Sequence, residues 1–221
     1  NIRHGAGMDK VLDLERTAKV IERCCPDFVA LQEVDSCARR SKNVDQVAEL
    51  GRLTLMRGTY AAAIPLQGGK YGVALLSKER PITVRRIAMP SRSEDRVLLV
   101  CEFSKCVIAC THLSLLEDEH NASADTIINE ALRWNKPFII MGDWNSHPDS
   151  PFIDRIRQHF SMISANEVPT FPADKPKETL DYIAVLKATG AEMAVRKSFE
   201  VVEEKTASDH RPLVADLALK T

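Results

Sequence analysis

The chain has 221 residues, of which 44% are hydrophobic and 28% charged, an ordinary globular composition for one large domain or two small ones. Its formal net charge is -1, so no overall basic field favours tight non-specific binding of nucleic acid, although a local basic patch stays open. Aromatic residues make up 5%, which leaves few stacking platforms for single strands. No apolar stretch is long enough to span a membrane, so stable membrane insertion is not expected.

Six cysteines are present, and their spacing contains no C-x-x-C pair of the zinc-binding type. Several lie in apolar runs, which favours buried thiols and leaves the redox compartment open. They are Cys24, Cys25, Cys37, Cys101, Cys106 and Cys110.

In chain order, the first part of the sequence predicts a helix, a strand and a second helix. Apolar residues repeat at helical spacing over 13–25, and Pro26 stops that helix. A short apolar run at 28–31 predicts a buried strand. The second helix is expected over 44–56 and is weakened by Gly51.

From residue 59 the pattern changes to strand-like runs separated by glycine, proline and serine. Helices and strands alternate again later, around a proline-rich loop at 166–178. The expected strands are 60–65, 71–77, 82–89, 97–103, 107–113, 138–142, 180–186, 191–202 and 213–219, and the expected helices are 123–134 and 151–160. We therefore predict one mixed α/β domain over 1–221, with sheets in the middle and helices outside.

The most informative stretch is the strand at 138–142 and the residues that follow it. The apolar strand ends in Asp143 and Asn145, two residues apart, whose side chains are expected to point the same way. Burying a carboxylate beside an amide is costly unless a metal, a water or a phosphoryl group uses them. The structural alternative is a strand-end turn in which both side chains bond the backbone.

The same pattern, an apolar strand that ends in a polar residue suited to metal or phosphate, recurs elsewhere in the chain. Each such residue has a structural alternative as a turn cap, a solvated acid or a hydrogen-bonded histidine. Together, however, these acids, amides and imidazoles at strand ends predict convergence on one pocket. The further residues are Asn1, Glu33, His112, Asp181, Asp209 and His210.

The chain contains, in order, NIRHG, LQEVD, YGVALLS, THLS, GDWNSHP, TFP, LDYI and SDHRP. This ordered set resembles the endonuclease/exonuclease/phosphatase superfamily over nearly the whole chain, most closely its bacterial metal-dependent hydrolase branch. Deoxyribonuclease I, abasic-site endonucleases, inositol polyphosphate 5-phosphatases and sphingomyelinases are more distant. The resemblance implies a four-layered α/β sandwich, in which two packed, mostly antiparallel sheets carry helices on both outer faces. It also implies metal-dependent hydrolysis of phosphodiester, or alternatively phosphomonoester, bonds by water.

The resemblance further implies which residues hold a metal. Glu33 matches the main metal-binding carboxylate, Asn1 matches the asparagine that helps to hold metal or phosphate, and Asp209 is expected near the metal. Mg²⁺ or Mn²⁺ suits such a site, because hard cations take oxygen ligands and keep several waters, so that few carboxylates are enough.

Catalytic roles follow from the same resemblance. Asp143 matches the acid that orients or deprotonates the attacking water, and Asn145 matches the residue that bonds the phosphate. Asp181 matches the acid that orients His210, which is expected on a phosphoryl oxygen. His112 matches a histidine of the deoxyribonuclease and sphingomyelinase branches.

Two features depart from the family pattern. The stretch GGKYG at 68–72 has no acid where the deoxyribonuclease branch has the glutamate that partners His112. His112 is therefore expected either to act as an acid or only to bind phosphate. No long DNA-gripping insertion is visible, and Arg39, Arg40 and Lys42 could form either a basic rim that faces substrate or a solvated loop.

Two classes of function stay open at this point. The first is a phosphoesterase whose substrate is a small molecule, a lipid headgroup or a nucleic acid, with nucleic acid disfavoured by the charge and the few aromatic residues. The second is a phosphate- or metal-binding module that keeps the fold without turnover. We expect a monomer and a first strand that is truncated ahead of Asn1. Relatives in this branch are often exported, which favours a periplasmic or secreted location.

Overall fold

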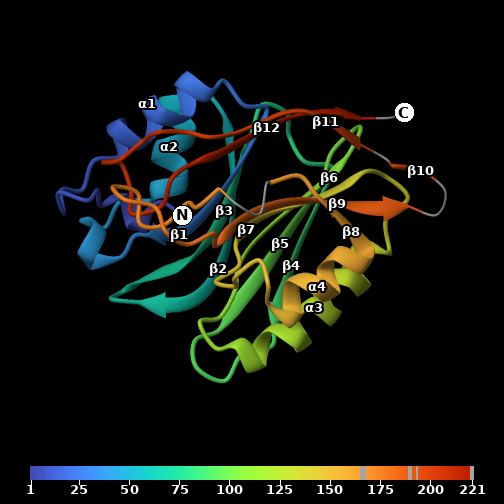
Figure 1. Ribbon diagram of the computed structural model, residues 1–221. Coiled ribbons are helices and arrows are strands. Elements are labelled where there is room, and N and C mark those ends of the chain that lie inside the picture. Colours follow the sequence, from blue (N-terminus) through green and yellow to red (C-terminus); the bar gives the residue numbers. More distant parts are fainter. Residues whose placement is uncertain (165–167, 189–190, 193, 220–221) are drawn as a thin grey trace.

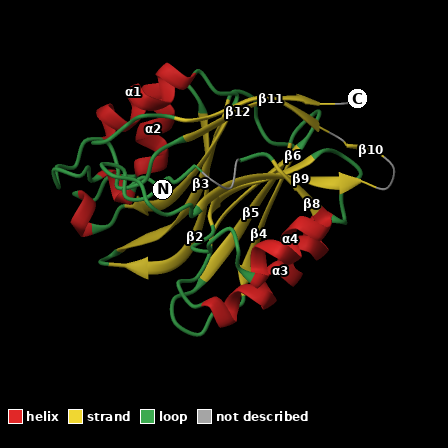
Figure 2. Ribbon diagram, in the orientation of Figure 1, coloured by secondary structure: helices red, strands yellow, loops and turns green. Residues whose placement is uncertain are grey.

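The computed structural model describes residues 1–164, 168–188, 191–192 and 194–219. Figure 1 shows the order of the elements along the chain, and Figure 2 shows helices at opposite sides of the central strands. The helices of the described residues are α1 (Leu14–Cys24), α2 (Gln46–Thr54), α3 (Glu117–Ala131) and α4 (Pro151–His159), with short 3-10 turns at η1 (Arg3–Gly5) and η2 (Arg39–Ser41).

The described strands form three hydrogen-bonded sheets, in which every strand pair is antiparallel except β6 with β7. The three-stranded sheet has the order β1-β3-β2 and contains β1 (Phe28–Ser36), β2 (Arg57–Leu66) and β3 (Gly69–Ser77). The two-stranded sheet consists of β11 (Ala194–Val201) and β12 (Leu213–Leu219). The seven-stranded sheet has the order β10-β9-β7-β6-β5-β4, with β8 paired to β9, and contains β4 (Thr83–Met89), β5 (Arg96–Glu102), β6 (Val107–His112), β7 (Phe138–Asp143), β8 (Phe160–Met162), β9 (Asp181–Ala188) and β10 (Ala191–Glu192).

The sheets and helices lie in layers (Figure 1). Three clusters of buried apolar side chains fill the space between these layers. α1 and α2 cover one face of the three-stranded sheet, and Ile21, Val47 and Leu76 belong to the apolar cluster between them. α3 and α4 cover the far face of the seven-stranded sheet. Between the two sheets, Leu75 of β3 and Leu99 of β5 belong to a third cluster, against which β12 also packs. The order through the molecule is therefore helices, sheet, sheet, helices.

Strands at the centre of the seven-stranded sheet are buried on both faces. In β6, Val107 and Ala109 belong to the cluster beneath α3 and α4, whereas Ile108 and Cys110 face the other sheet. A strand that is covered on both faces reads as an unbroken apolar run instead of an alternating one. The strand predicted at 107–113 is confirmed for this reason.

Side-chain caps fix the starts of three helices. Asp13, Asp45 and Ser150 accept hydrogen bonds from backbone N–H groups in the first turns of α1, α2 and α4. The predicted bounds of these helices are correct to within two residues. The start predicted at 123 for α3 is wrong, because that helix begins at Glu117 without a side-chain cap. Its first turn is instead acidic, which suits the positive end of a helix dipole.

The strands differ from the sequence prediction in two further ways. The strand predicted at 28–31 continues to Ser36, because a bulge between Leu31 and Val34 lets the ladder resume. The mixed α/β class with mostly antiparallel sheets is confirmed, but the described strands form three sheets instead of two. Of the loop predicted at 166–178 and the strand predicted at 191–202, residues 166–167 and 193 lie outside the described residues.

All six cysteines are free thiols. The prediction of buried thiols is confirmed for Cys101, Cys106 and Cys110. Cys25 and Cys37, which lie at element ends, are exposed.

Candidate active site

Three neighbouring strands bring polar side chains to one edge of the seven-stranded sheet. β6 and β7 run parallel with His112 beside Asp143, and β7 and β9 run antiparallel with Asp143 beside Asp181. The chain at Gly142 approaches β6 so closely that a Cβ there would lie 2.0 Å from the carbonyl oxygen of Thr111. Position 142 therefore needs glycine. The register of the three strands places His112, Asp143 and Asp181 in one row.

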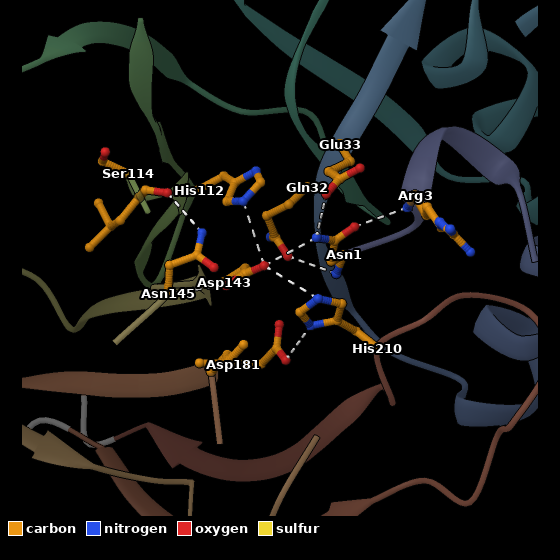
Figure 3. A network of polar contacts seen from close by, with 12 residues as sticks. Asn1, Arg3, Gln32, Glu33, His112, Ser114, Asp143, Asn145, Asp181 and His210 are labelled. Carbon is orange, nitrogen blue, oxygen red and sulfur yellow. Dashed lines mark hydrogen bonds and ion pairs between the residues drawn. The ribbon is translucent and has the colours of Figure 1, made fainter. Parts of the chain in front are cut away.

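Asp143 is at the centre of the polar network in Figure 3. Its carboxylate is buried, and Oδ2 accepts a hydrogen bond from Nδ2 of Asn1 at 3.1 Å. The same oxygen lies 3.6 Å from Nε2 of His112 and 3.6 Å from Nε2 of His210. Oδ1 accepts a hydrogen bond from the backbone N–H of Asn145 at 3.0 Å. Asp143 therefore makes the strand-end turn that the sequence allowed as an alternative, and it also faces both histidines.

The imidazole ring of His210 is hydrogen-bonded to the carboxylate of Asp181. Its Nδ1 lies 2.8 Å from Oδ2 of Asp181, which also accepts a hydrogen bond from Oγ1 of Thr170 at 2.5 Å. Burial lowers the pKa of His210, but the charge and hydrogen bond of Asp181 outweigh it and raise that pKa overall. Burial raises the pKa of Asp181, and the His210 charge and hydrogen bond reverse this to a lowered pKa. The pair thus favours a protonated His210 beside an ionised Asp181.

His112 faces Asp143 from the other side and has different neighbours. Its Nδ1 lies 3.3 Å from Nη1 of Arg96 and 3.4 Å from Oη of Tyr71. Burial lowers the pKa of His112, and the nearby Asp143 carboxylate raises it. The charge of Arg96 lowers it further, so the pKa of His112 is lowered overall. The two histidines of the site are therefore shifted in opposite directions.

Glu33 lies in the bulge of β1, where its φ of 55° is left-handed. Oε1 of Glu33 accepts a hydrogen bond from Nδ2 of Asn1 at 3.0 Å, so Asn1 joins Glu33 to Asp143. Burial raises the pKa of Glu33, but the Asn1 hydrogen bond and the nearby His112 lower it overall. The half-buried carboxylate is therefore favoured in its ionised form.

Asp209 and Asn145 lie at the edge of this network. Oδ2 of Asp209 is 3.3 Å from Nε of Arg3. Asn145 has a left-handed φ of 47°, and its Nδ2 donates a hydrogen bond to the carbonyl oxygen of Leu113 at 2.9 Å. One of the two amide N–H groups of Asn145 is therefore used within the protein.

The donors present suit a cation that prefers oxygen ligands. One ligand atom each from Asp143, Asp181 and His210 lies within 4.8 Å of the other two, so this buried group could hold a metal ion. Asp181 and His210 already bond each other, however. Glu33 is a more open oxygen donor, since the described part of the chain gives a hydrogen bond to its Oε1 and none to its Oε2. Carboxylates of this kind fit Mg²⁺ or Mn²⁺ better than a softer metal.

A cavity of about 520 Å³ lies beside the network, between β1, β12 and the seven-stranded sheet. Asn1, Asp181 and His210 reach its wall, but most of its lining is apolar, as at Leu31 and Leu213. An anionic phosphoester needs polar donors around it, so the phosphate is not assigned to this cavity.

A family model described as "Endonuclease/Exonuclease/phosphatase family" matches residues 1–210. The chain belongs to the endonuclease/exonuclease/phosphatase family. Among solved structures, an endonuclease/exonuclease/phosphatase from Bacteroides vulgatus is 19% identical, with a TM-score of 0.77 over 94% of this chain and 90% of the other. No curated protein matches the chain.

Two further solved structures with this fold have a named activity or a bound anion. The mannosyl-6-phosphatase of Bacteroides thetaiotaomicron is 13% identical, with a TM-score of 0.72 over 93% of this chain and 90% of the other. The human Nocturnin catalytic domain with a bound sulfate anion is 20% identical, with a TM-score of 0.69 over 93% and 86%. These likenesses establish the fold, and relatives within the endonuclease/exonuclease/phosphatase family are phosphoester hydrolases.

The sequence resemblance to this family is thus confirmed, and the structure shows where the predicted site residues lie. Asn145 joins the network through its backbone, and Asp209 directly precedes His210. The predicted residues that hydrogen bonds or ion pairs join directly are Asn1, Glu33, His112, Asp143, Asp181 and His210.

Sequence reasoning missed several neighbours of these family residues. Tyr71 and Thr170 lie inside YGVALLS and TFP, which were recognised as strings without a role for either residue. Arg3 likewise lies inside NIRHG without an assigned role, and Arg96 lies in none of the recognised strings. A search for polar side chains near predicted strand starts would have found Arg96.

The three basic residues that the sequence suggested as a rim facing substrate, Arg39, Arg40 and Lys42, do not behave alike. Arg40 donates hydrogen bonds to Asp35 at 2.9 and 2.8 Å, and its guanidinium lies 5.3 Å from the centre of the Tyr71 ring. Arg39 and Lys42 are exposed, as a solvated loop requires. In the described residues, no helix combines the length and apolar character needed to cross a membrane.

Proposed function

We propose that this chain is a divalent-metal-dependent phosphoesterase that hydrolyses phosphodiester bonds, with phosphomonoesters as the alternative, by attack of water at phosphorus. One observation carries this proposal: Oδ2 of Asp143 has Asn1 at 3.1 Å and an imidazole Nε2 on each side at 3.6 Å. A buried carboxylate among hydrogen-bond donors supports a base that works beside a bound anion.

In the proposed reaction, Asp143 orients the attacking water and takes its proton as the water oxygen bonds to phosphorus. The ester P–O bond breaks, and its electron pair leaves with the departing oxygen, which takes up a proton from solvent. Asp143 then returns its proton to water. This sequence needs an ionised base, and the Asp143 carboxylate accepts hydrogen bonds from Nδ2 of Asn1 and from the backbone N–H of Asn145.

The remaining residues bind and orient the phosphoryl group. His210, kept protonated by Asp181, donates to a phosphoryl oxygen, and His112 and Asn145 donate to others. Such donors lower the barrier because charge builds up on these oxygens during attack. Asp181 positions His210 and does not itself touch the substrate.

Glu33, with Asp209 and Asn1, would hold Mg²⁺ or Mn²⁺. When bound, such an ion neutralises charge on the phosphate and assists the leaving oxygen. The packing order of helices, sheet, sheet and helices supports the four-layered sandwich expected for the whole chain.

The test is hydrolysis of bis-p-nitrophenyl phosphate and p-nitrophenyl phosphate with Mg²⁺, Mn²⁺ or chelator. We expect metal-dependent cleavage, preferentially of the diester, and a loss of about 10³-fold in His210→Ala, since charged donors to the phosphoryl group are worth this much. His159→Ala at the end of α4 is the matched control and should keep wild-type activity. Unchanged hydrolysis in chelator would show that the mechanism is wrong.

The competing function is a binding module without turnover. It predicts that calorimetry detects metal binding, but that neither p-nitrophenyl ester is hydrolysed. It also predicts no hydrolysis of a panel of sugar phosphates, lipid headgroups and oligonucleotides. The same panel would identify the substrate class, which we propose to be a small phosphoester. The monomer prediction is checked on the same sample by light scattering.

A further inference from the structure

The Nδ1 atoms of the two site histidines have different neighbours. Nδ1 of His112 lies beside a guanidinium and a phenol, whereas Nδ1 of His210 lies beside a carboxylate. Arg96 begins β5 and Tyr71 lies in β3, and both residues are buried. Nη1 of Arg96 lies 3.3 Å from Nδ1 of His112, and Oη of Tyr71 lies 3.4 Å from the same nitrogen. Side chains from two different sheets therefore converge on one atom of the ring.

The chemistry of the guanidinium fixes the direction of this contact. Every N–H group of Arg96 is a donor and none can accept, so Nδ1 of His112 is the acceptor. An imidazole that accepts at Nδ1 carries its single proton on Nε2. Nε2 of His112 faces Oδ2 of Asp143 at 3.6 Å, so this proton points to the centre of the site.

Arg96 is costly where it lies. Its side chain is 9% exposed, and its ion-pair partner Glu94, at 3.0 Å, is 41% exposed. Nε of Arg96 is buried and has no hydrogen-bond partner within the described ranges. An apolar side chain of similar size would pack there without leaving a buried donor unpaired. Stability alone therefore does not account for Arg96.

We propose that Arg96, together with Tyr71, is a positioning residue that holds His112 as a neutral hydrogen-bond donor, with Nε2–H directed at a phosphoryl oxygen of the substrate. This inference rests on the proposed function. His112 keeps its Nε2 proton throughout and passes none to the leaving oxygen. The fixed charge of Arg96 behind the ring strengthens the donor toward an anionic phosphoryl group. Phosphate binding is thereby chosen over acid catalysis for His112.

The first test reads the ring without any turnover. Protein with ¹⁵N-labelled histidine is studied by NMR, and the His112 signals are assigned by their loss in His112→Gln. We expect an unprotonated Nδ1 and a protonated Nε2. Arg96→Met, which keeps chain length but has no donor, should yield a mixture of tautomers, whereas Arg96→Lys should keep the wild-type pattern. A protonated Nδ1 in the wild-type protein would overturn the proposal.

The second test compares methyl aryl phosphodiesters whose leaving groups are p-nitrophenol and phenol. A donor to a phosphoryl oxygen matters equally for both, so His112→Ala should lower kcat by the same factor, about 10²-fold. A proton donor to the leaving oxygen would matter far more for phenol. Arg96→Met should lower kcat about tenfold on both esters without a matching rise in KM, and Arg96→Lys should restore most of it. The exposed Arg86→Met on β4 is the control.

These tests separate the inference from the function on which it rests. If wild type hydrolyses no ester but its ring pattern is as expected, the proposed function fails and the geometry stands. If hydrolysis is metal-dependent but His112→Ala is harmful only with phenol as the leaving group, the function stands and this inference fails. Should Arg96→Met not fold, the wild-type tautomer and the His112→Ala comparison still decide.

Discussion

The two histidines of the site invite comparison, because each presents Nε2 to the same oxygen of Asp143 at 3.6 Å. They differ at the other ring nitrogen, where His210 meets the Asp181 carboxylate and His112 meets the Arg96 guanidinium. Burial lowers the pKa of both histidines; Asp181 reverses this for His210, whose pKa is raised overall, whereas Arg96 lowers the pKa of His112 further and it stays lowered overall. Position in the site therefore does not fix a histidine's role, since the residue behind the ring decides whether the donor is charged or neutral.

The largest effect is expected from Asp143→Asn, which removes the carboxylate that both histidines share. The proposed base is lost while the shape of the side chain is kept, so kcat on bis-p-nitrophenyl phosphate should fall about 10³-fold. Asp154→Asn on the exposed side of α4 is the matched control. Retention of more than a tenth of wild-type activity would mean that Asp143 serves the turn with Asn145 and not the chemistry.

An intermediate effect is expected from Asp181→Asn, which removes the acid from one histidine only. His210 then loses the partner that keeps it charged, and kcat should fall about 10²-fold, while the His112 tautomer stays unchanged. Asp216→Asn on β12 is an exposed control. A change in the His112 signals of the Asp181 variant would show that the two histidines are not independent.

The same variant makes the Asp181–His210 pair visible in stability. The raised pKa of His210 adds stability that is complete below its unfolded value of 6.5 and is lost as the pH rises through the folded value. The lowered pKa of Asp181 adds stability above its unfolded value of 3.8, which is lost as the pH falls through the folded value. The free energy of unfolding of Asp181→Asn should thus fall below wild type by about 3 kcal/mol, mostly between these two values. Denaturant unfolding across pH measures this, and a difference that does not vary with pH would contradict the ionic pair.

The smallest effect is expected from Thr170→Val, which removes the hydroxyl that donates to Asp181 at 2.5 Å. Losing one hydrogen bond to a charged group should cost about 2 kcal/mol of unfolding free energy and lower kcat severalfold, because Asp181 keeps His210. Thr126→Val, whose hydroxyl bonds a helix carbonyl at the surface, is the matched control. If Thr170→Val and Thr126→Val lowered kcat by the same factor, Thr170 would contribute to folding and not to the positioning of Asp181.

Local sequence was enough to pick out most residues of the polar network that forms the candidate site. An apolar run that ends in an acid, an amide or a histidine is a short string, and strings such as GDWNSHP keep their meaning without a structure. Prediction failed where a helix started without a capping side chain, at Glu117, and where β1 continued past Glu33 through a bulge. The start of α3 carries a different local signal, its acidic first turn, whereas the continuation of β1 depends on pairing with β3, which is distant in the chain.

By itself, then, the sequence determined the family, the mixed α/β class and the set of polar residues at strand ends. Only the tertiary structure decided what lies behind each histidine, because those partners are distant in the chain: 29 positions separate His210 from Asp181, and 16 and 41 separate His112 from Arg96 and Tyr71. The register of β6, β7 and β9 and the packing of β3 against β5 and β6 set these neighbours. Charge at a ring nitrogen depends on atoms within a few ångströms, and folding alone brings those atoms there.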